Sequence, residues 1–419
     1  MTRASIGIVL TALIASACVS APGPSGPPVV AGAPSAPASV APSTGPSGSP
    51  PALPSPTADP VPTLQPFPDA TPLDRFPAAL EGVAWAGSQA ETLADGRFIQ
   101  HVYAGTLNHP PTIRLDVEHP GGYPWLITTG DLVGIVTADR GSVGLQIRSA
   151  VDGSTVGTLS LAGAGSGPVE IDPIHHLAYV ALVLPNGGVA IHRVSFDGAA
   201  DDVLVSLDKR FTPDGIPSER YDLTLDPEGT LIVEACGSAD GCRLWEIPSG
   251  AKAAPAPRTL PGHPPILCSI VGATAEWLVV QDDAVCRADT GDAPLPVRAI
   301  HRPDGKSHLV TDDHVGPGPL VEWKGRTVLV GADPVFIGAT VAVVTYDLET
   351  GARSTEIHVL SPGPDDTTTL VAKTVLPAPW ILLQPWVLEP TNLPSIPASL
   401  FNIDTHQIVE LPFGTFGWT

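Results

Sequence analysis

The chain has 419 residues, with 49 prolines, 42 glycines and a formal net charge of −22. A negative charge of this size repels nucleic-acid phosphates and anionic membrane surfaces, so it argues against a nucleic-acid-binding role. The prolines are concentrated before residue 80, and no charged residue occurs between Ala4 and Ala58. Such a segment cannot bury enough apolar surface to offset its ordering entropy, which leaves about 340 residues for a folded domain.

The first 17 residues have the pattern of a signal peptide. Met1–Arg3 is a short basic start, and Ala4–Ala17 is an uncharged apolar run. At about 1.5 Å per residue, this run is too short to cross a hydrocarbon core of about 30 Å. Small residues then lead to Cys18, as expected of a cleavage site.

The segment Ile14–Cys18 resembles the lipobox of bacterial lipoproteins, in which the cysteine is lipidated and the peptide is cut directly before it. The resemblance implies an exported protein whose Cys18 anchors it by lipid to the extracytoplasmic face of the cell membrane. The chain departs from the family at Ala15, where leucine is usual. The alternative is an ordinary secretory signal cut near Ala17, with Cys18 incidental.

Residues 18–77 follow as a linker that repeats Pro, Ser, Ala, Gly and Thr. Chains rich in proline favour the extended polyproline II conformation, so we expect a disordered stalk that lifts a domain away from the membrane. The predicted organisation is a signal peptide at 1–17, the lipidated Cys18 with its linker at 18–77, and one domain at 78–419.

Four further cysteines occur in the domain, an even number that suggests disulfides in an exported chain. Cys236 and Cys242 flank a short Gly-containing turn between two runs of β-forming residues. They would therefore face each other across a hairpin, and we predict a disulfide between them. No C-x-x-C pattern occurs, which disfavours a zinc ribbon.

Cys268 and Cys286 are the remaining pair, and their spacing fits less well. If 267–271, 276–281 and 285–288 are successive strands, the two Cα atoms lie about 9.5 Å apart. A disulfide needs less than roughly 7 Å. Either the register differs or both cysteines are free thiols.

From residue 80 onward, short runs of β-branched and apolar residues alternate with Gly, Asp, Asn and Pro. No long segment has helical periodicity with caps, so we predict an all-β domain. Clear examples of the runs are Leu132–Val136, Ala178–Val183, Leu278–Val280 and Val341–Tyr346.

A two-residue turn recurs after a strand, at steps of 41 to 60 residues. A unit of that length has room for about four strands, which is typical of a β-propeller blade. We expect seven blades, with six or eight as alternatives and a pair of β-sandwiches as the rival fold. The turns are Asp152-Gly153, Asp197-Gly198, Ser249-Gly250, Thr290-Gly291, Thr350-Gly351 and Thr405-His406.

Two motifs carry a further resemblance, Asp226-Pro-Glu-Gly-Thr-Leu231 and Tyr346-Asp-Leu-Glu-Thr-Gly351. They resemble repeats of bacterial seven- or eight-bladed β-propellers, and the second is also similar to repeats of pyrroloquinoline-quinone enzymes and their cofactor-free relatives. The resemblance covers roughly 120–412 and implies a fold but no particular activity. No docking Trp follows Gly351, so we expect no quinone and no other cofactor.

Both ends of the domain are predicted to meet in one blade. Residues 82–118 supply further strands, and Thr415–Thr419 could be the inner strand of the same blade. That arrangement would close the ring and leave no edge strand exposed.

No catalytic motif is found, neither G-x-S-x-G nor H-E-x-x-H. His175 and His176 are adjacent, and adjacent residues of a strand point to opposite faces, so we expect a hairpin or polar role rather than a shared metal. No catalytic, cofactor-binding or metal-binding residue is predicted.

Two connections have a basic density that is unusual for so acidic a chain. Both are expected to lie between blades, where loops on a rigid scaffold often bind ligands. They could bind a small acidic ligand, and the alternative is solvent-exposed charge. The residues are Lys209, Arg210, Arg220, Arg302 and Lys306.

These patterns favour a surface-displayed propeller that acts as a binding or scaffold module. Its expected partners are the membrane, through the lipid anchor, and a protein, small-molecule or carbohydrate ligand, but no nucleic acid. The alternative is an extracytoplasmic lactonase- or glycosidase-like hydrolase, which would need carboxylates or histidines that converge at the axial mouth.

Overall fold

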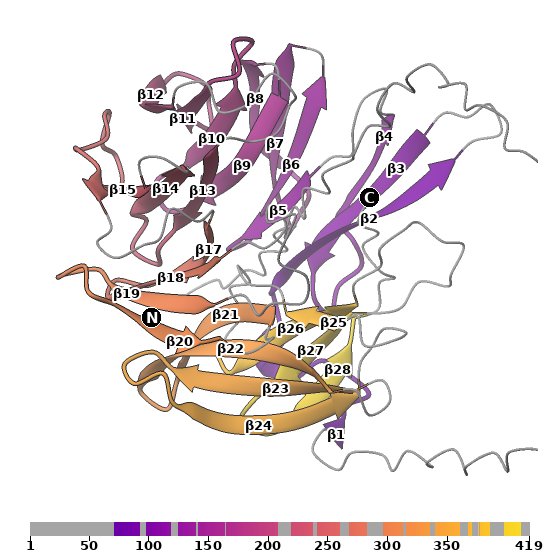
Figure 1. Cartoon of the computed structure of the whole chain (residues 1–419). Helices are drawn as coiled ribbons and strands as arrows, with labels where there is room; N and C mark the ends of the chain where they lie inside the picture. The colour runs from indigo at the N-terminus through magenta and orange to yellow at the C-terminus, as the bar shows by residue number, and fades with distance from the viewer. Residues whose placement is uncertain are drawn as a thin grey trace, which may run out of the picture. The chain divides into compact units, whose positions relative to one another are not determined.

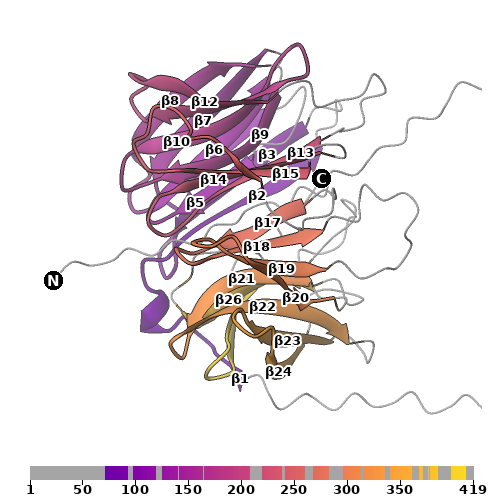
Figure 2. The same cartoon turned by 60° about the vertical axis from the view of Figure 1, so that its left-hand side comes forward.

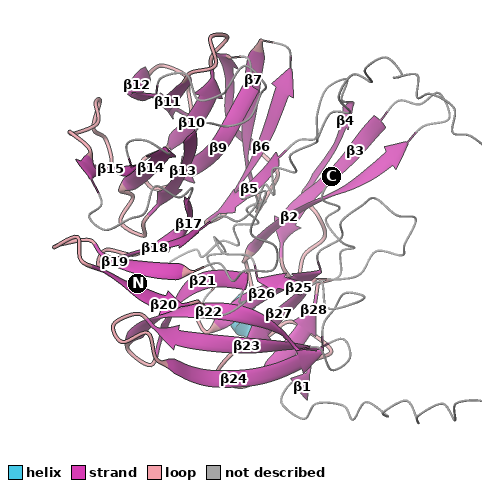
Figure 3. Cartoon of the chain, viewed as in Figure 1, coloured by secondary structure: helices cyan, strands magenta, loops and turns pink. Residues whose placement is uncertain are grey.

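The computed structural model describes residues 71–92, 98–118, 125–139, 141–163, 165–207, 219–237, 241–259, 268–282, 296–312, 316–335, 340–360, 368–370, 376, 378–385 and 398–411. All of them belong to one compact unit of the chain. Their secondary structure is almost entirely β-strand, with one short helix, η1, at Ala78–Leu80 (Figure 3). No helix among them is long and apolar enough to cross a membrane.

The described strands form seven sheets that succeed one another along the chain, as expected of a β-propeller (Figure 1). The first sheet has β2 (Ala84–Thr92), β3 (Phe98–Thr106) and β4 (Ile113–Glu118). The second has β5 (Trp125–Thr129), β6 (Leu132–Asp139), β7 (Ser142–Ser149) and β8 (Thr155–Ala162). The third has β9 (Gly165–Asp172), β10 (Leu177–Val183), β11 (Val189–Ser195) and β12 (Asp201–Leu207). The fourth has β13 (Glu219–Leu225), β14 (Leu231–Gly237), β15 (Gly241–Ile247) and β16 (Arg258–Thr259).

The remaining three sheets follow the same sequential order. The fifth has β17 (Cys268–Ala273), β18 (Trp277–Asp282), β19 (Val297–His301) and β20 (Ser307–Thr311). The sixth has β21 (Gly316–Trp323), β22 (Arg326–Val335), β23 (Thr340–Asp347) and β24 (Arg353–Leu360). The seventh has β25 (Thr368–Leu370), β26 (Trp380–Pro385), β27 (Ser399–Asn402) and β28 (Gln407–Glu410), with β1 (Thr71–Pro72) added beside β28.

Strand β10 shows why the sequence forms stacked sheets. Its six residues from Leu177 to Leu182 are all buried, because both faces of its sheet are covered. Ala178, Val180 and Leu182 enter the apolar core toward the second sheet. Their neighbours Leu177, Tyr179 and Ala181 enter the core toward the fourth sheet. Alternate residues of one strand thus belong to two different cores. Because both sets are apolar, the sequence of such a strand is an unbroken apolar run.

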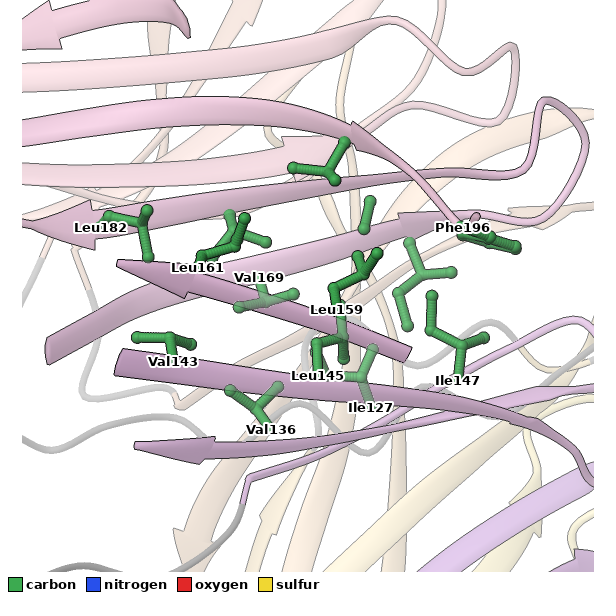
Figure 4. Packing of buried hydrophobic residues seen from close by; sticks show 14 of the residues in the cluster. Ile127, Val136, Val143, Leu145, Ile147, Leu159, Leu161, Val169, Leu182 and Phe196 are labelled. Atoms are coloured by element: carbon green, nitrogen blue, oxygen red, sulfur yellow. The ribbon is translucent and has the colours of Figure 1, made fainter. Parts of the chain in front are cut away.

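Seven apolar cores link the sheets into a closed circle, one between each pair of neighbours. Figure 4 shows the core between the second and third sheets, where side chains such as Leu145 and Val169 fill the space between the ribbons. The closing core joins the first sheet to the seventh through Trp85 and Leu107 on one side and Trp380 and Leu400 on the other.

The predicted repeat corresponds to the turn between the third and fourth strands of a sheet. The predicted turn residues Gly153, Gly198, Gly250, Gly351 and His406 all lie in such turns with positive φ. The conformation is left-handed, which glycine adopts without strain.

In the fifth sheet, the turn between the third and fourth strands lies at Asp304-Gly305. In the fifth sheet the equivalent residue is Gly305, with φ 69°, whereas Thr290-Gly291 lies outside the described residues. Asp304-Gly305 joins β19 to β20 directly and therefore carries the repeat.

The first sheet contains the second, third and fourth strands of a blade. In five of the other six sheets, the residue after the third strand donates its N–H to a carbonyl at the start of the second strand, as Ala150 does to Asp131. Leu107 makes the equivalent bond to Val83, which identifies β2 as a second strand. Among the described strands β2 pairs only with β3. Thr415–Thr419, predicted as the inner strand here, lie outside the described residues.

The sequence predicted that the domain begins at residue 78. Residues before that position also pair with it. Thr71 and Pro72 pair in parallel with Gln407 and Ile408 of β28. Leu73 adds a hydrogen bond from its N–H to the Ile408 carbonyl, at 2.8 Å. The N-terminal strand thus lies on the outer edge of the last sheet, where Figure 1 shows indigo β1 beside yellow β28.

The strand register bears on both predicted disulfides. Cys236 of β14 is the direct partner of Cys242 in β15. Cys268 is instead opposite Asp282, and Cys286 lies outside the described residues. β18 pairs with β19, which begins at Val297, and the strand predicted at 285–288 lies outside the described residues.

We predict that the turn glycines differ in importance although their φ angles are similar. A Cβ at Gly153 would lie 2.5 Å from the Thr112 carbonyl oxygen, whereas nothing lies within 4 Å of a Cβ at Gly250. Gly250→Ala should lower the free energy of unfolding by about 1 kcal/mol, the strain of an alanine in the left-handed conformation. Gly153→Ala should cost about 2 kcal/mol more, because the first sheet must move. Urea unfolding of both variants measures the difference, and equal costs would contradict the close contact.

We also predict that Cys236 and Cys242 form a disulfide. Direct partners in an antiparallel pair have Cα atoms about 4.5 or about 5.5 Å apart, both within the range for a disulfide. Peptide mapping without reductant should recover the linked pair, and Cys242→Ser should lower the free energy of unfolding by about 2 kcal/mol. Alkylation of either cysteine in the native exported protein would show the prediction to be wrong.

Candidate functional site

Among the five predicted basic residues, the structure describes the side chains of Arg302 and Lys306. Lys209 and Arg210 lie outside the described residues, and the backbone of Arg220 lies in β13 opposite Cys236. Arg302 and Lys306 lie in the turn between β19 and β20. The sequence predicted that these residues connect two sheets. The turn instead joins two strands of one sheet.

Arg302 holds the fourth and fifth sheets together. Its side chain is only 10% exposed. It donates to Asp226 and Glu246 of the fourth sheet, each at 2.8 Å, and to the Thr274 carbonyl of its own sheet. Arg258 extends this network by bonding both Glu246 and the Arg302 carbonyl.

Burial by itself would lower the pKa of Arg302, but the hydrogen bonds with Glu246 and Asp226 outweigh it and raise the pKa above its usual value. Its charge is thus stabilised in place by these two carboxylates. We therefore assign Arg302 a structural role between sheets, rather than the ligand-binding role that its position in the sequence suggested.

Lys306 lies beside an open groove of about 430 Å³. Trp277, a partly exposed residue at the start of β18, lines this groove. The His301 ring lies 5.2 Å from the indole, and the His308 ring stands edge-to-face with it at 5.6 Å. The elements that carry these residues run side by side in Figure 2. We call this site the Trp277 groove, lined by Trp277, His301, Asp304, Lys306, Ser307, His308 and Glu349.

Hydrogen bonds hold the β19–β20 turn in shape at the rim of the Trp277 groove. Asp304 accepts from the Lys306 backbone N–H at 3.1 Å, and its carboxylate lies 2.8 Å from His301 Nδ1 and 2.7 Å from Lys306 Nζ. The pKa of Asp304 lies well below its usual value, first because of Lys306 and then because of His301. The same ion pair raises the pKa of Lys306.

The sixth sheet contributes Glu349 to the Trp277 groove. Glu349 lies in the β23–β24 turn, whose backbone N–H groups at 349 and 350 donate to Asp347, both at 3.0 Å. A Cβ at Gly351 of this turn would lie 3.2 Å from the Leu309 carbonyl oxygen in β20. The turn therefore rests directly on the neighbouring sheet, so the groove joins two sheets.

His175 and His176 lie in the β9–β10 turn, and they have separate structural roles. His175 Nδ1 is 2.7 Å from Asp172, which Ser249 of the next sheet also contacts. His176 stacks on Phe196. Across the described part of the chain, no group of three or more His, Cys, Asp or Glu side chains is placed to hold a metal ion.

The sequence contained only a weak signal for the Trp277 groove. His301 and His308 flank the Asp304-Gly305 turn, and this symmetry could have identified them. Trp277 and Glu349 belong to different sheets and are far apart in the sequence. Their proximity follows from the order of the sheets, which no short motif records.

We predict that Arg302→Gln strongly destabilises the domain. The substitution leaves Asp226, whose side chain is 2% exposed, without its cation, and breaking a buried pair typically costs about 3–5 kcal/mol. Lys324→Gln is the matched control, because Lys324 is 66% exposed and its partner Asp404 is 50% exposed, so the loss of this pair should cost less than about 1 kcal/mol. Urea titration measures both, and similar costs would contradict the structural role.

No protein-family model matches the sequence, and no curated protein matches it. Among solved structures, prolyl oligopeptidase B from Galerina marginata, bound to a 35mer hydrolysis and macrocyclization substrate, is similar with a TM-score of 0.49 and 10% identity, over 81% of this chain and 52% of that one. Its apo form gives a TM-score of 0.47 and 9% identity, over 78% and 50%.

An uncharacterized protein from Listeria monocytogenes EGD-e gives a TM-score of 0.37 and 10% identity, over 68% of this chain and 93% of that one. The chain spans about half the length of the two prolyl oligopeptidase structures. The fold described here rests on the chain's own sheets and cores.

Proposed function

We propose that this protein is a binding module, displayed outside the cell membrane on a proline-rich stalk that a lipid on Cys18 anchors. The signal-peptide pattern and the lipobox-like segment Ile14–Cys18 support export and anchoring. The formal charge of −22 is suited to a soluble domain that does not bind nucleic acid.

The Trp277 groove is the observation that carries the binding role. It combines a partly exposed aromatic ring with hydrogen-bonding groups, the composition typical of ligand sites. Two turns of adjacent sheets build it, and each turn is fixed by hydrogen bonds to an Asp side chain, Asp304 or Asp347. A ligand would therefore meet a preformed surface and would not have to order it.

The predicted alternative, a lactonase- or glycosidase-like hydrolase, stays a prediction. It needs carboxylates or histidines that converge on a substrate at the mouth of the ring. The Trp277 groove lies at strand-connecting turns, and its one Asp is engaged by Lys306 and His301. We therefore favour binding as the role of this groove.

We predict that Cys18 is acylated. In a bacterial host that acylates lipoproteins, an alkyne-tagged fatty acid should label the wild-type chain but not Cys18→Ser, since the thiol is the attachment point. Ala15→Leu restores the usual residue of the family and should be labelled at least as strongly as wild type.

Labelling is read by in-gel fluorescence, and membrane fractionation provides a second readout. If wild type and Cys18→Ser are equally unlabelled and both are released from the membrane, the anchor is wrong. The display part of the proposed function then fails, independently of what the groove binds.

A further inference from the structure

The lining of the Trp277 groove combines one indole with both hydrogen-bond donors and acceptors. The Lys306 ammonium and the Ser307 hydroxyl can donate, while Glu349 can only accept when ionised. A ligand that uses all of these groups must have an apolar face and several polar groups around its edge. Sugar rings have this character, because C–H groups gather on one face while hydroxyls surround the ring.

The charge of the Trp277 groove favours a neutral ligand. Asp304 and Lys306 are already paired at 2.7 Å, so neither offers a full free charge. Glu349 and the negative charge of the whole chain disfavour an anion. A cation would have to displace Lys306 from Asp304 to reach that carboxylate.

His301 and His308 pack against the indole of Trp277, which limits where a ligand can stack on it. His308 stands edge-to-face with the ring, and its buried Nε2 has no hydrogen-bond partner in the described structure. An N–H directed at an aromatic ring would account for that geometry. The histidines thus fix the orientation of the indole, and a fixed aromatic platform costs little entropy on binding.

We propose that the Trp277 groove binds a neutral saccharide, with a pyranose ring against the indole and its hydroxyls toward Lys306, Ser307 and Glu349. This inference rests on the proposed function and gives its ligand class. Because the groove is open and spans two turns, it suits a residue within a chain of sugars as well as a terminal one.

The test uses the full mature chain in micelles of a detergent without a sugar headgroup. The probes are maltotetraose, cellotetraose and mannotetraose, observed by saturation-transfer NMR from protein to sugar protons. At least one should bind saturably, with a Kd between about 10 µM and about 1 mM. Trp277→Ala should raise that Kd at least about tenfold, and Trp277→Phe should restore part of the affinity.

Trp323→Ala is the matched control. Trp323 is also partly exposed, but Lys324 covers its ring at 4.0 Å and it lies outside the groove. This variant should bind like wild type, and the melting temperature of each variant shows whether it is folded.

Three outcomes would overturn the inference. They are the absence of saturable binding by all three probes at millimolar concentration, equal loss in Trp277→Ala and Trp323→Ala, or unchanged affinity in folded Trp277→Ala. Acylation of Cys18 is measured separately, so a display module whose groove does not bind sugar remains distinguishable from a protein that is not displayed.

Discussion

Each sheet of this domain has two apolar faces, and neither face can be left in water without a large cost. In β10, alternate residues enter different cores, so the third sheet requires a neighbour on both sides. Every other sheet likewise needs a neighbour on each face. The first and seventh sheets meet this need by packing against each other, through Trp85 and Trp380. Closure of the circle is therefore the constraint on which the groove and the turns depend.

The cores hold the sheets together, and the polar turn residues fix how they meet. Asp172 and Asp226 occupy equivalent places, and each accepts backbone N–H groups within its own turn. Each also bonds a side chain of the next sheet, Ser249 in one case and Arg302 in the other. One carboxylate thus shapes a turn and aligns two sheets. The repeated Asp-Pro motif is explained by this double structural role, without any chemistry.

Much of the fold could be predicted from local patterns. The run Ala178–Val183 showed a strand, and the spacing of turns such as Thr350-Gly351 indicated four-stranded units, because both depend on neighbouring residues only. In the fifth sheet Gly305 has the left-handed conformation of the repeat, and the predicted Thr290-Gly291 lies outside the described residues. The Trp277 groove could not be predicted, since Glu349 reaches it only through the packing of the sixth sheet on the fifth.

The place where β1 joins the domain has a mechanical consequence. Among the described residues before β2, Thr71 and Pro72 pair with β28 at the outer edge of a sheet, and Leu73 directly after them packs against the core that closes the circle. Tension that reaches the domain through the chain before Thr71 is therefore borne first by this short ladder and by the Leu73 hydrogen bond. Under load β1 can peel away while the seven cores stay packed. In the anchored protein that we propose, release of β1 would add chain length between the anchor and the domain before the domain itself unfolds.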